Sequence, residues 1–266
     1  MRSPSFKLSA VLAAALIAGP GVAINSAFAT PAGQAAADNN NDSQIQESLT
    51  KTFSKSRYQG VQASVQNGVV TLTGTVSNYA TKEDADKAAH HTKKVTAVRN
   101  DIQVGGTEVS DRELQEKLLK AIEYDRVGYG TTAFNAISVS VENGVVTLGG
   151  HAYGPTDKSS AISVASYMPG VKDVIDDIQV DPVSPMDDEI RIRVARAIYG
   201  YPSLNKYAID PVKSIRISVQ NGHVTLFGQV DTQADKDTAF IRANGVPGTF
   251  KVTNDLVVAN QQESRR

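Results

Sequence analysis

The chain has no cysteine and no tryptophan, and only 3 of its 266 residues are methionine. Without a thiol it can form neither a disulfide nor a thiolate-ligated zinc or iron–sulfur centre, and it has no cysteine nucleophile. Aromatic residues are also few, at 6% of the chain. Small domains with few large side chains have thin cores, so packing between domains should add to the stability of this chain.

Only four histidines are present, and their positions suit neither a metal site nor a catalytic base. His90 and His91 are adjacent on an expected helix, where neighbours point about 100° apart. His151 and His223 occupy outward positions of expected strands, so we expect all four in solvent. The sequence also lacks the patterns of nucleophile–base pairs, phosphate-binding glycine loops and EF-hands. These absences predict that the protein is not an enzyme and has no catalytic residues, metal, cofactor or small-molecule substrate.

Neither sign of charge dominates, since the formal net charge is −1. By segment, residues 30–105 carry +1, residues 106–185 carry −6 and residues 186–266 carry +2. A nucleic-acid-binding protein is normally far more basic, so we expect no nucleic-acid partner. The uneven charge has two interpretations: electrostatic docking between an acidic middle segment and its basic neighbours, or ordinary solvated surfaces.

Long apolar runs are absent apart from one at residues 8–18. This run is shorter than the ~20 residues that span a bilayer. It follows Arg2 and Lys7 and precedes Ala27-Phe28-Ala29, an arrangement typical of a secretory signal peptide and its cleavage site. We expect residues 1–29 to be removed after Ala29 and the remaining chain to be exported to the periplasm. Residues 30–42 are rich in Ala and Asn and lack periodicity, which predicts a flexible leader.

The rest of the chain repeats itself three times. The segment NGVVTLTG, which begins at Asn67, recurs as NGVVTLGG from Asn143 and as NGHVTLFG from Asn221, and a second similar block follows each copy. The second block begins with Asn or Asp followed by Asp101, Asp177 or Asp255. The spacing from the Asn of each copy to this aspartate is 34 residues in every case. A constant spacing indicates three copies of one structural unit. The predicted modules are residues 43–105, 110–181 and 186–259, with linkers at 105–109 and 181–186 and a tail at 260–266.

Each Asn-Gly pair favours a two-residue type I′ turn, because both residues tolerate positive φ. In the second repeat such a turn pairs Val141 with Val146 and Ile137 with Gly150, so the apolar residues share one face. The other repeats give the same register. The last inward pair of each hairpin contains a glycine, such as Gly150 in the second repeat. We expect this glycine to leave room for a closely packed helix. The predicted structural glycines are Gly68, Gly74, Gly144, Gly150, Gly222 and Gly228.

Helical patterns flank each hairpin. In the second repeat Ser110-x-x-Glu113 forms a capping box ahead of the first helix, and in the third repeat Asp187 or Asp188 can cap it. A second helix follows each hairpin, with the candidate caps Thr81, Thr156 and Thr232. An alternating third strand ends each repeat. We predict an α+β fold of three tandem αββαβ modules, each a small three-stranded mixed sheet with two helices on one face and its third strand parallel to its second.

The hairpin pattern V-x-N-G-x-V-x-L-x-G and the later pattern G-V-x-x-V-x-(N/D)-D-(I/L)-x-V together resemble the BON domain family. The resemblance covers about residues 43–105, 110–181 and 186–259, and the first copy departs from it with Lys94 where the family usually has glycine. It implies a non-enzymatic, exported protein of the envelope, associated with phospholipid or membrane surfaces and with osmotic or envelope stress.

The segment from the first helix to the turn is longer in repeats two and three, at 33 and 34 residues against 24 in repeat one. We call these longer segments the insertions. They combine aromatic with basic side chains, which suits an interface with lipid or protein. The candidate lipid- or partner-binding residues are Tyr124, Arg126, Tyr129, Phe134, Tyr199, Tyr201, Lys206 and Tyr207.

These rings could instead fill a thin core or pack between modules. Two functions therefore remain open: a module that binds membrane surfaces or phospholipid, and a periplasmic scaffold that binds other envelope proteins. Arg191, Arg193 and Arg196 give one helix some basic charge, but acidic residues precede them. The sequence leaves the oligomeric state and the identity of the ligand undetermined.

Overall fold

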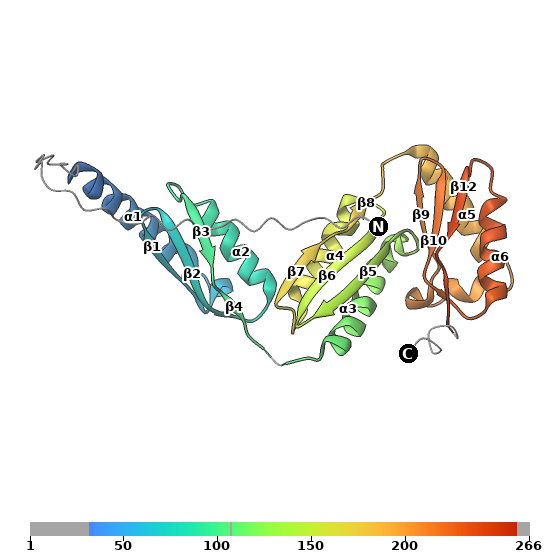
Figure 1. Ribbon diagram of the computed structural model, residues 1–266, viewed down its shortest axis with the longest axis horizontal. Coiled ribbons are helices and arrows are strands. Elements are labelled where there is room, and N and C mark those ends of the chain that lie inside the picture. The colour runs from blue at the N-terminus through green and yellow to red at the C-terminus, as the bar shows by residue number, and fades with distance from the viewer. Residues whose placement is uncertain (1–31, 107, 260–266) are drawn as a thin grey trace, which may run out of the picture.

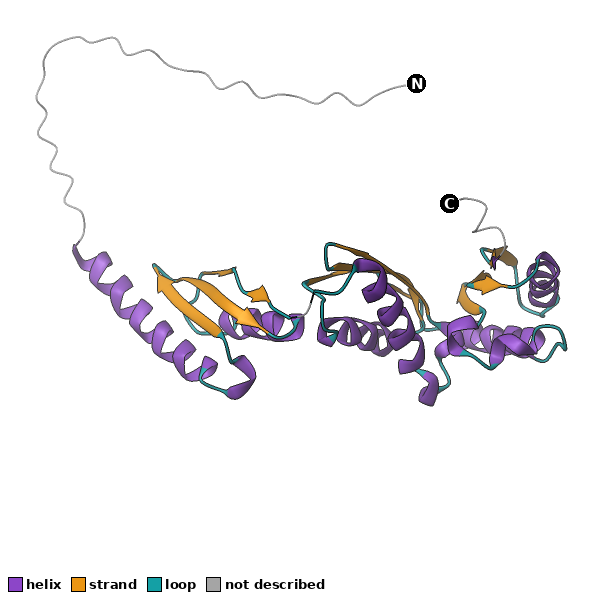
Figure 2. Cartoon of the chain, turned by 90° about the horizontal axis from the view of Figure 1, so that it is seen from below, coloured by secondary structure: helices purple, strands orange, loops and turns teal. Residues whose placement is uncertain are grey.

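The computed structural model describes residues 32–106 and 108–259. Three α+β units follow one another along an elongated molecule, and in each a small sheet carries two helices on one face (Figure 1 and Figure 2). This architecture confirms the predicted fold class. The predicted signal peptide, its cleavage site and the tail lie outside the described residues.

The units repeat one order of elements. Unit 1 contains α1 (Ala32–Phe53), β1 (Val61–Gln66), β2 (Val69–Val76), α2 (Tyr79–His90), β3 (Ala97–Asn100) and β4 (Gln103–Val104). Unit 2 contains α3 (Asp111–Asp125), β5 (Ala136–Glu142), β6 (Val145–Ala152), α4 (Pro155–Tyr167), β7 (Asp173–Asp176) and β8 (Gln179–Val180). Unit 3 contains α5 (Pro185–Tyr199), β9 (Arg216–Gln220), β10 (His223–Phe227), β11 (Gln229–Val230), α6 (Gln233–Asn244), β12 (Lys251–Asn254) and β13 (Val257–Val258). The short 3-10 helices are η1 (Ser56–Tyr58), η2 (Val127–Tyr129), η3 (Thr132–Phe134), η4 (Asn205–Ala208) and η5 (Pro211–Lys213).

The hairpins have the predicted turn and register. Val141 pairs with Val146 and Ile137 with Gly150, and the hairpins of units 1 and 3 follow the same pattern. The three turn asparagines have φ of 53–54° and the glycines after them 74–81°, as a type I′ turn requires. The inward residues Val146 and Leu148 are fully buried.

The third strand runs parallel to the second in every unit, as predicted. It is not continuous, because each unit breaks it into two short pieces. At the break in unit 1 the Asn100 side chain accepts a hydrogen bond from the N–H of Ile102, and Asp176 and Asn254 do the same in units 2 and 3. Such a turn bends the backbone, yet Ile102 still reaches the core with no exposed surface.

The glycines in the last inward pair of each hairpin have a role other than the one predicted. Gly74 and Gly150 have φ of 109° and 84°, where L side chains are strained. A Cβ on Gly74 would lie 1.9 Å from the carbonyl oxygen of Gly60, and one on Gly150 would lie 2.1 Å from that of Ala136. The obstacle is thus the backbone of the neighbouring strand and not a helix, so the expectation of helix packing was wrong.

An aspartate of each first helix binds the hairpin turn, which the sequence reasoning missed. The Asp187 carboxylate accepts hydrogen bonds from the N–H groups of Asn221 and Gly222, at 2.9 and 2.8 Å. Asp42 and Asp111 hold their turns in the same way. Each aspartate stands three residues before a buried aliphatic residue of its helix, a spacing that could have revealed them.

Several predicted caps were wrong, because other residues occupy the cap positions. Ser184 caps α5, and this leaves Asp187 free to hold the turn. Asn78 caps α2 and Gly154 begins α4, so Thr81 and Thr156 lie inside their helices. The predicted caps at Ser110 and Thr232 are confirmed.

The predicted leader is helical from Ala32 onward, because it continues α1 toward the N-terminus. Alanine is the best helix former, and the C-terminal part of α1 is anchored by Ile45 and Leu49, which are buried in the core of unit 1. The departure of Lys94 from the family pattern leaves the backbone unchanged. Its φ of 72° lies in the left-handed region, as do those of Gly170 and Gly248.

Candidate functional site

The two insertions lie at the junction of units 2 and 3 (Figure 1). The insertion of unit 2 forms η2 and η3 after α3, and that of unit 3 forms η4 and η5 after α5. Each contacts the other unit: η5 packs on α3, and η3 packs on β9. The insertions therefore join two units, which confirms in part the alternative that their rings pack between modules.

One side of the junction is held by Arg216 of β9. Its guanidinium lies 3.1 Å from the Glu123 carboxylate and donates a hydrogen bond to the carbonyl oxygen of Thr132, at 2.7 Å. Burial raises the pKa of Glu123, and Arg216 offsets only part of that rise. Phe134 of the same insertion packs against the core of unit 3. An ion pair and an aromatic ring thus cross the junction together.

A second polar cluster joins the same two units around Asp181. Its carboxylate accepts hydrogen bonds from Ser218 and Gln220 and lies 3.4 Å from the Arg191 guanidinium. The side chains of Asp181 and Arg191 are 0% and 1% exposed. The ring of His151 lies 3.2 Å from the same carboxylate, so the prediction that this histidine is solvated was wrong. These contacts are electrostatic docking between an acidic and a basic module.

Three of the predicted binding residues, Arg126, Lys206 and Tyr207, are held inside their own units by an aspartate. Asp157 lies near the start of α4 and accepts hydrogen bonds from Arg126, Thr131 and Asn135. Asp235 occupies the same position of α6 and accepts from Lys206 and Tyr207. In unit 1, which has no insertion, this position is Thr81. The sequence signal that we missed is an aspartate present only in the repeats with an insertion.

Both basic residues among the predicted binding residues form ion pairs with these aspartates. Arg126 pairs with Asp157 at 3.0 Å, and both side chains are largely buried. Lys206 pairs with Asp231 and Asp235, whose hydrogen bonds raise its pKa. Neither cation is left unpaired for an anionic ligand.

The predicted tyrosines divide into buried and exposed groups. Tyr207 is 2% exposed and belongs to the core of unit 3. Tyr199 donates a hydrogen bond to the carbonyl oxygen of Ile215, and burial raises its pKa to about 12. Tyr124 and Tyr129 are exposed at 47% and 71%. The half-exposed Tyr201 lies apart from them, under the guanidinium of Arg242.

Exposed apolar residues of both insertions lie close in sequence to the contact between Tyr124 and Asp210. The Tyr124 hydroxyl donates a hydrogen bond to the Asp210 carboxylate, at 3.4 Å, and Ile209 and Val212, 81% and 46% exposed, flank that aspartate. Val127 and Tyr129 follow Tyr124 closely in sequence, and both are exposed. We call these five apolar residues the insertion surface: Tyr124, Val127, Tyr129, Ile209 and Val212.

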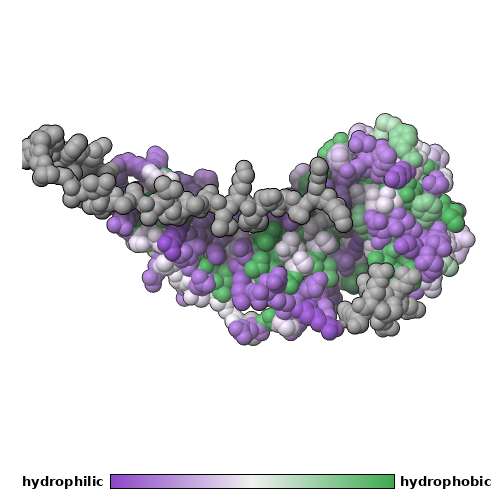
Figure 3. Space-filling view, in the orientation of Figure 1, coloured by the Kyte–Doolittle hydropathy of each residue, from purple (hydrophilic) through white to green (hydrophobic). Residues whose placement is uncertain are grey.

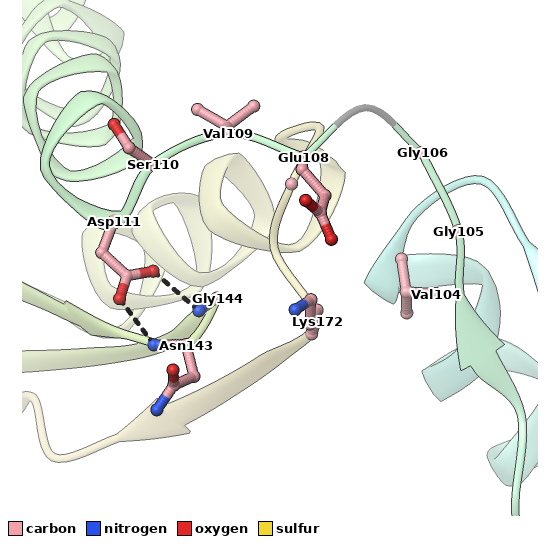
Figure 4. Close-up of a pocket in the computed structure, with 11 residues that line it drawn as sticks. Val104, Gly105, Gly106, Glu108, Val109, Ser110, Asp111, Asn143, Gly144 and Lys172 are labelled. Carbon is pink, nitrogen blue, oxygen red and sulfur yellow. Dashed lines mark hydrogen bonds between the residues drawn. The ribbon is translucent and has the colours of Figure 1, made fainter.

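Figure 4 shows a hollow elsewhere, where the linker between units 1 and 2 passes the turn of unit 2. It has a volume of about 490 Å³. Asp111 bonds the backbone of Asn143 and Gly144 there, while Glu108 and Lys172 also line the hollow. No nucleophile and base meet among these lining residues.

Within residues 32–106 and 108–259, no group of three His, Asp or Glu side chains is placed to hold a metal ion. Over the same residues, no helix combines the length and the apolar character needed to cross a bilayer.

Comparison with known proteins places the chain in a family. Osmotically-inducible protein Y of Escherichia coli (strain K12) is 29% identical over 133 residues, which are 45% of this chain and 60% of that protein. The similarity thus spans less than two thirds of that relative. Among solved structures, CdsD, a structural protein of the Type III secretion system of Chlamydia trachomatis, is 14% identical, with a TM-score of 0.24 over 84% of this chain and 95% of that chain; a score this low supports no conclusion here. The BON domain model matches residues 41–106, 110–182 and 187–260, and the chain therefore belongs to the BON domain family.

Proposed function

We propose that the chain is a non-enzymatic, periplasmic envelope protein with a role in osmotic or envelope stress, and that it binds membrane surfaces or phospholipid through its tandem BON modules. Residues 43–105, 110–181 and 186–259 are the modules in this proposal, and a signal peptide cleaved after Ala29 exports them. The observation that carries it is the insertion surface.

The insertion surface has the composition of a site that enters a headgroup layer. Tyrosine combines an apolar ring with a polar tip and suits the boundary between water and lipid. Tyr129, Ile209 and Val127 expose much of their apolar surface, and the Arg126 guanidinium lies 4.1 Å from the centre of the Tyr129 ring. Lys120 and Lys213 are exposed on the adjoining α3 and η5, so anionic headgroups find cations nearby. The aspartate anchors hold the surface in place, which lowers the entropic cost of binding.

Co-sedimentation with vesicles tests the proposal. The purified protein should bind vesicles that contain anionic phospholipid more strongly than vesicles of zwitterionic lipid alone. Replacing Val127 and Tyr129 together by serine should weaken binding about tenfold or more, since each loses apolar area that would enter the lipid. Both side chains are exposed, so circular dichroism should show an unchanged fold. The matched control is Ile175→Thr, which removes an exposed apolar group from β7, outside the insertion surface.

If the control weakens binding as much as the double variant, the insertion surface is not the contact. If the wild type ignores every vesicle, the membrane proposal fails. The alternative, a periplasmic scaffold for envelope proteins, is then tested by capture of partners from an envelope extract by wild type and double variant.

A further inference from the structure

Inside the chain, units 1 and 2 meet through their second helices. Tyr79 of α2 is only 8% exposed and belongs to the hydrophobic core cluster of unit 2. Burial, together with the carboxylates of Glu83 and Asp173, raises the pKa of its hydroxyl. Ile162 of α4 packs against the same cluster. The contact is therefore helix on helix, with an aromatic ring of one unit entering the other.

The two helices run antiparallel. Tyr167 at the C-terminal end of α4 lines one groove with Asn78 and Thr81, at the N-terminal end of α2. A second groove between the helices is lined by Glu83 and Lys87 of α2 and by Ser159 and Ile162 of α4, among others. Counted from their caps, α2 and α4 share the fifth and ninth positions in this contact, which are Glu83 and Lys87 of α2 and Ser159 and Ser163 of α4, so overlapping faces meet.

Unit 3 exposes the equivalent face of α6 without a partner in the described chain. We define the α6 face as Gln233, Asp237, Phe240, Ile241 and Asn244, each at a position that α2 or α4 uses for its contact. All five residues are exposed, Phe240 at 37% and Ile241 at 66%. In α4 the position of Phe240 is Ile162, which is packed at the contact with α2. The helix lies at the end of the elongated molecule, where apolar residues reach the surface (Figure 1 and Figure 3).

We propose that the α6 face binds the α6 face of a second copy of this chain, so that two chains join end to end as a symmetric dimer. The contact inside the chain supplies the reason, because it shows that this fold pairs second helices through like faces. The α2 and α4 faces already cover each other, so α6 is the second helix left available. A symmetric dimer uses the same patch on both copies.

The charges of the α6 face agree with antiparallel pairing. If the twofold axis passes between Phe240 and Ile241, the phenyl ring of one copy lies against the isoleucine of the other. Asp237 then lies opposite Asn244 of the second copy, so no two like charges face each other. The contact is small and lies at the low end of specific interfaces, which implies a weak dimer with a dissociation constant on the order of 10–100 μM.

Sedimentation equilibrium of the purified protein tests the proposal over a range of about 5–200 μM, which brackets the expected dissociation constant. The average mass should rise from monomer toward dimer with concentration. Ile241→Asp places a charge on both sides of the contact and should weaken association at least about tenfold. Val183→Asp is the matched control, since Val183 is 87% exposed and lies off the α6 face, and it should associate like the wild type.

Because the chain contains no cysteine, a single engineered thiol reports on one position. Under mild oxidation Ile241→Cys should form a disulfide-linked dimer, whereas Val183→Cys should stay largely monomeric. A wild type that is monomeric over the whole range overturns the proposal. So does association that Ile241→Asp leaves unchanged, or crosslinking that is equal at the two positions.

Discussion

The stability that each turn-binding aspartate contributes can be compared between units of the same chain. Asp187 is 2% exposed and accepts hydrogen bonds of 2.9 and 2.8 Å from Asn221 and Gly222, the second of which is buried. Each bond to a charged acceptor contributes about 1.5 kcal/mol or more. Asp187→Ala should therefore cost unit 3 about 3 kcal/mol, because no water replaces the carboxylate at the buried N–H.

Asp42 makes the corresponding bonds in unit 1, and both are shorter, at 2.7 Å. The bond to Asn67 is exposed and that to Gly68 is part-buried, so water can take the place of the carboxylate. Asp42→Ala should cost only about 1 kcal/mol. Bond length alone predicts the larger loss of stability for Asp42→Ala, whereas burial predicts it for Asp187→Ala. We expect burial to decide.

Hydrogen exchange measured by mass spectrometry gives the opening free energy of each unit separately. In calorimetry, the transition of unit 3 should fall by roughly 10–20 °C in Asp187→Ala. The variant Asp187→Asn, which keeps one oxygen acceptor, should lie between alanine and wild type. The reasoning is refuted if Asp42→Ala destabilises its unit as much as Asp187→Ala does, or if exchange at the turn of unit 3 does not change.

Three further outcomes follow from the structure. Gly150→Ala should destabilise unit 2 by about 2 kcal/mol or more, since it combines a left-handed φ with a close carbonyl oxygen, whereas Gly128→Ala, with nothing within 4 Å, should melt within about 0.5 kcal/mol of wild type. Tyr207→Phe should cost unit 3 about 1–2 kcal/mol in denaturant titrations, because the hydroxyl bonds both Asp235 and the Asp231 N–H. The raised pKa of Glu123 means that its stabilising contribution is present at low pH and is lost as the pH rises above the ordinary value of 4.5. The Glu123→Gln variant should therefore lose less stability than the wild type as the pH rises through the acid range. If the free energy of unfolding changes equally with pH in both proteins, Glu123 does not have a raised pKa.

The site was predicted less completely than the fold, because the burial of its side chains depends on partners that are distant in sequence. Aromatic content pointed to the insertions, but it could not tell Tyr207, a core residue with a bonded hydroxyl, from Tyr129, which is exposed. The difference is made by Asp235, 28 residues away in sequence from Tyr207. A side chain's burial depends on such distant partners, which the local pattern of residues does not contain.

The sequence by itself determined the repeat, the hairpin register and the order of elements. These depend on local chemistry: Asn-Gly favours a type I′ turn, and a period of two fixes which strand residues share a face. Tertiary structure alone decided the rest. It turned Asp187 from a helix cap into a holder of the turn, made Gly74 necessary because of a neighbouring strand, and placed His151 between two units. Each of these depends on groups that are far apart in the chain and are brought together only when the helices, sheets and units pack.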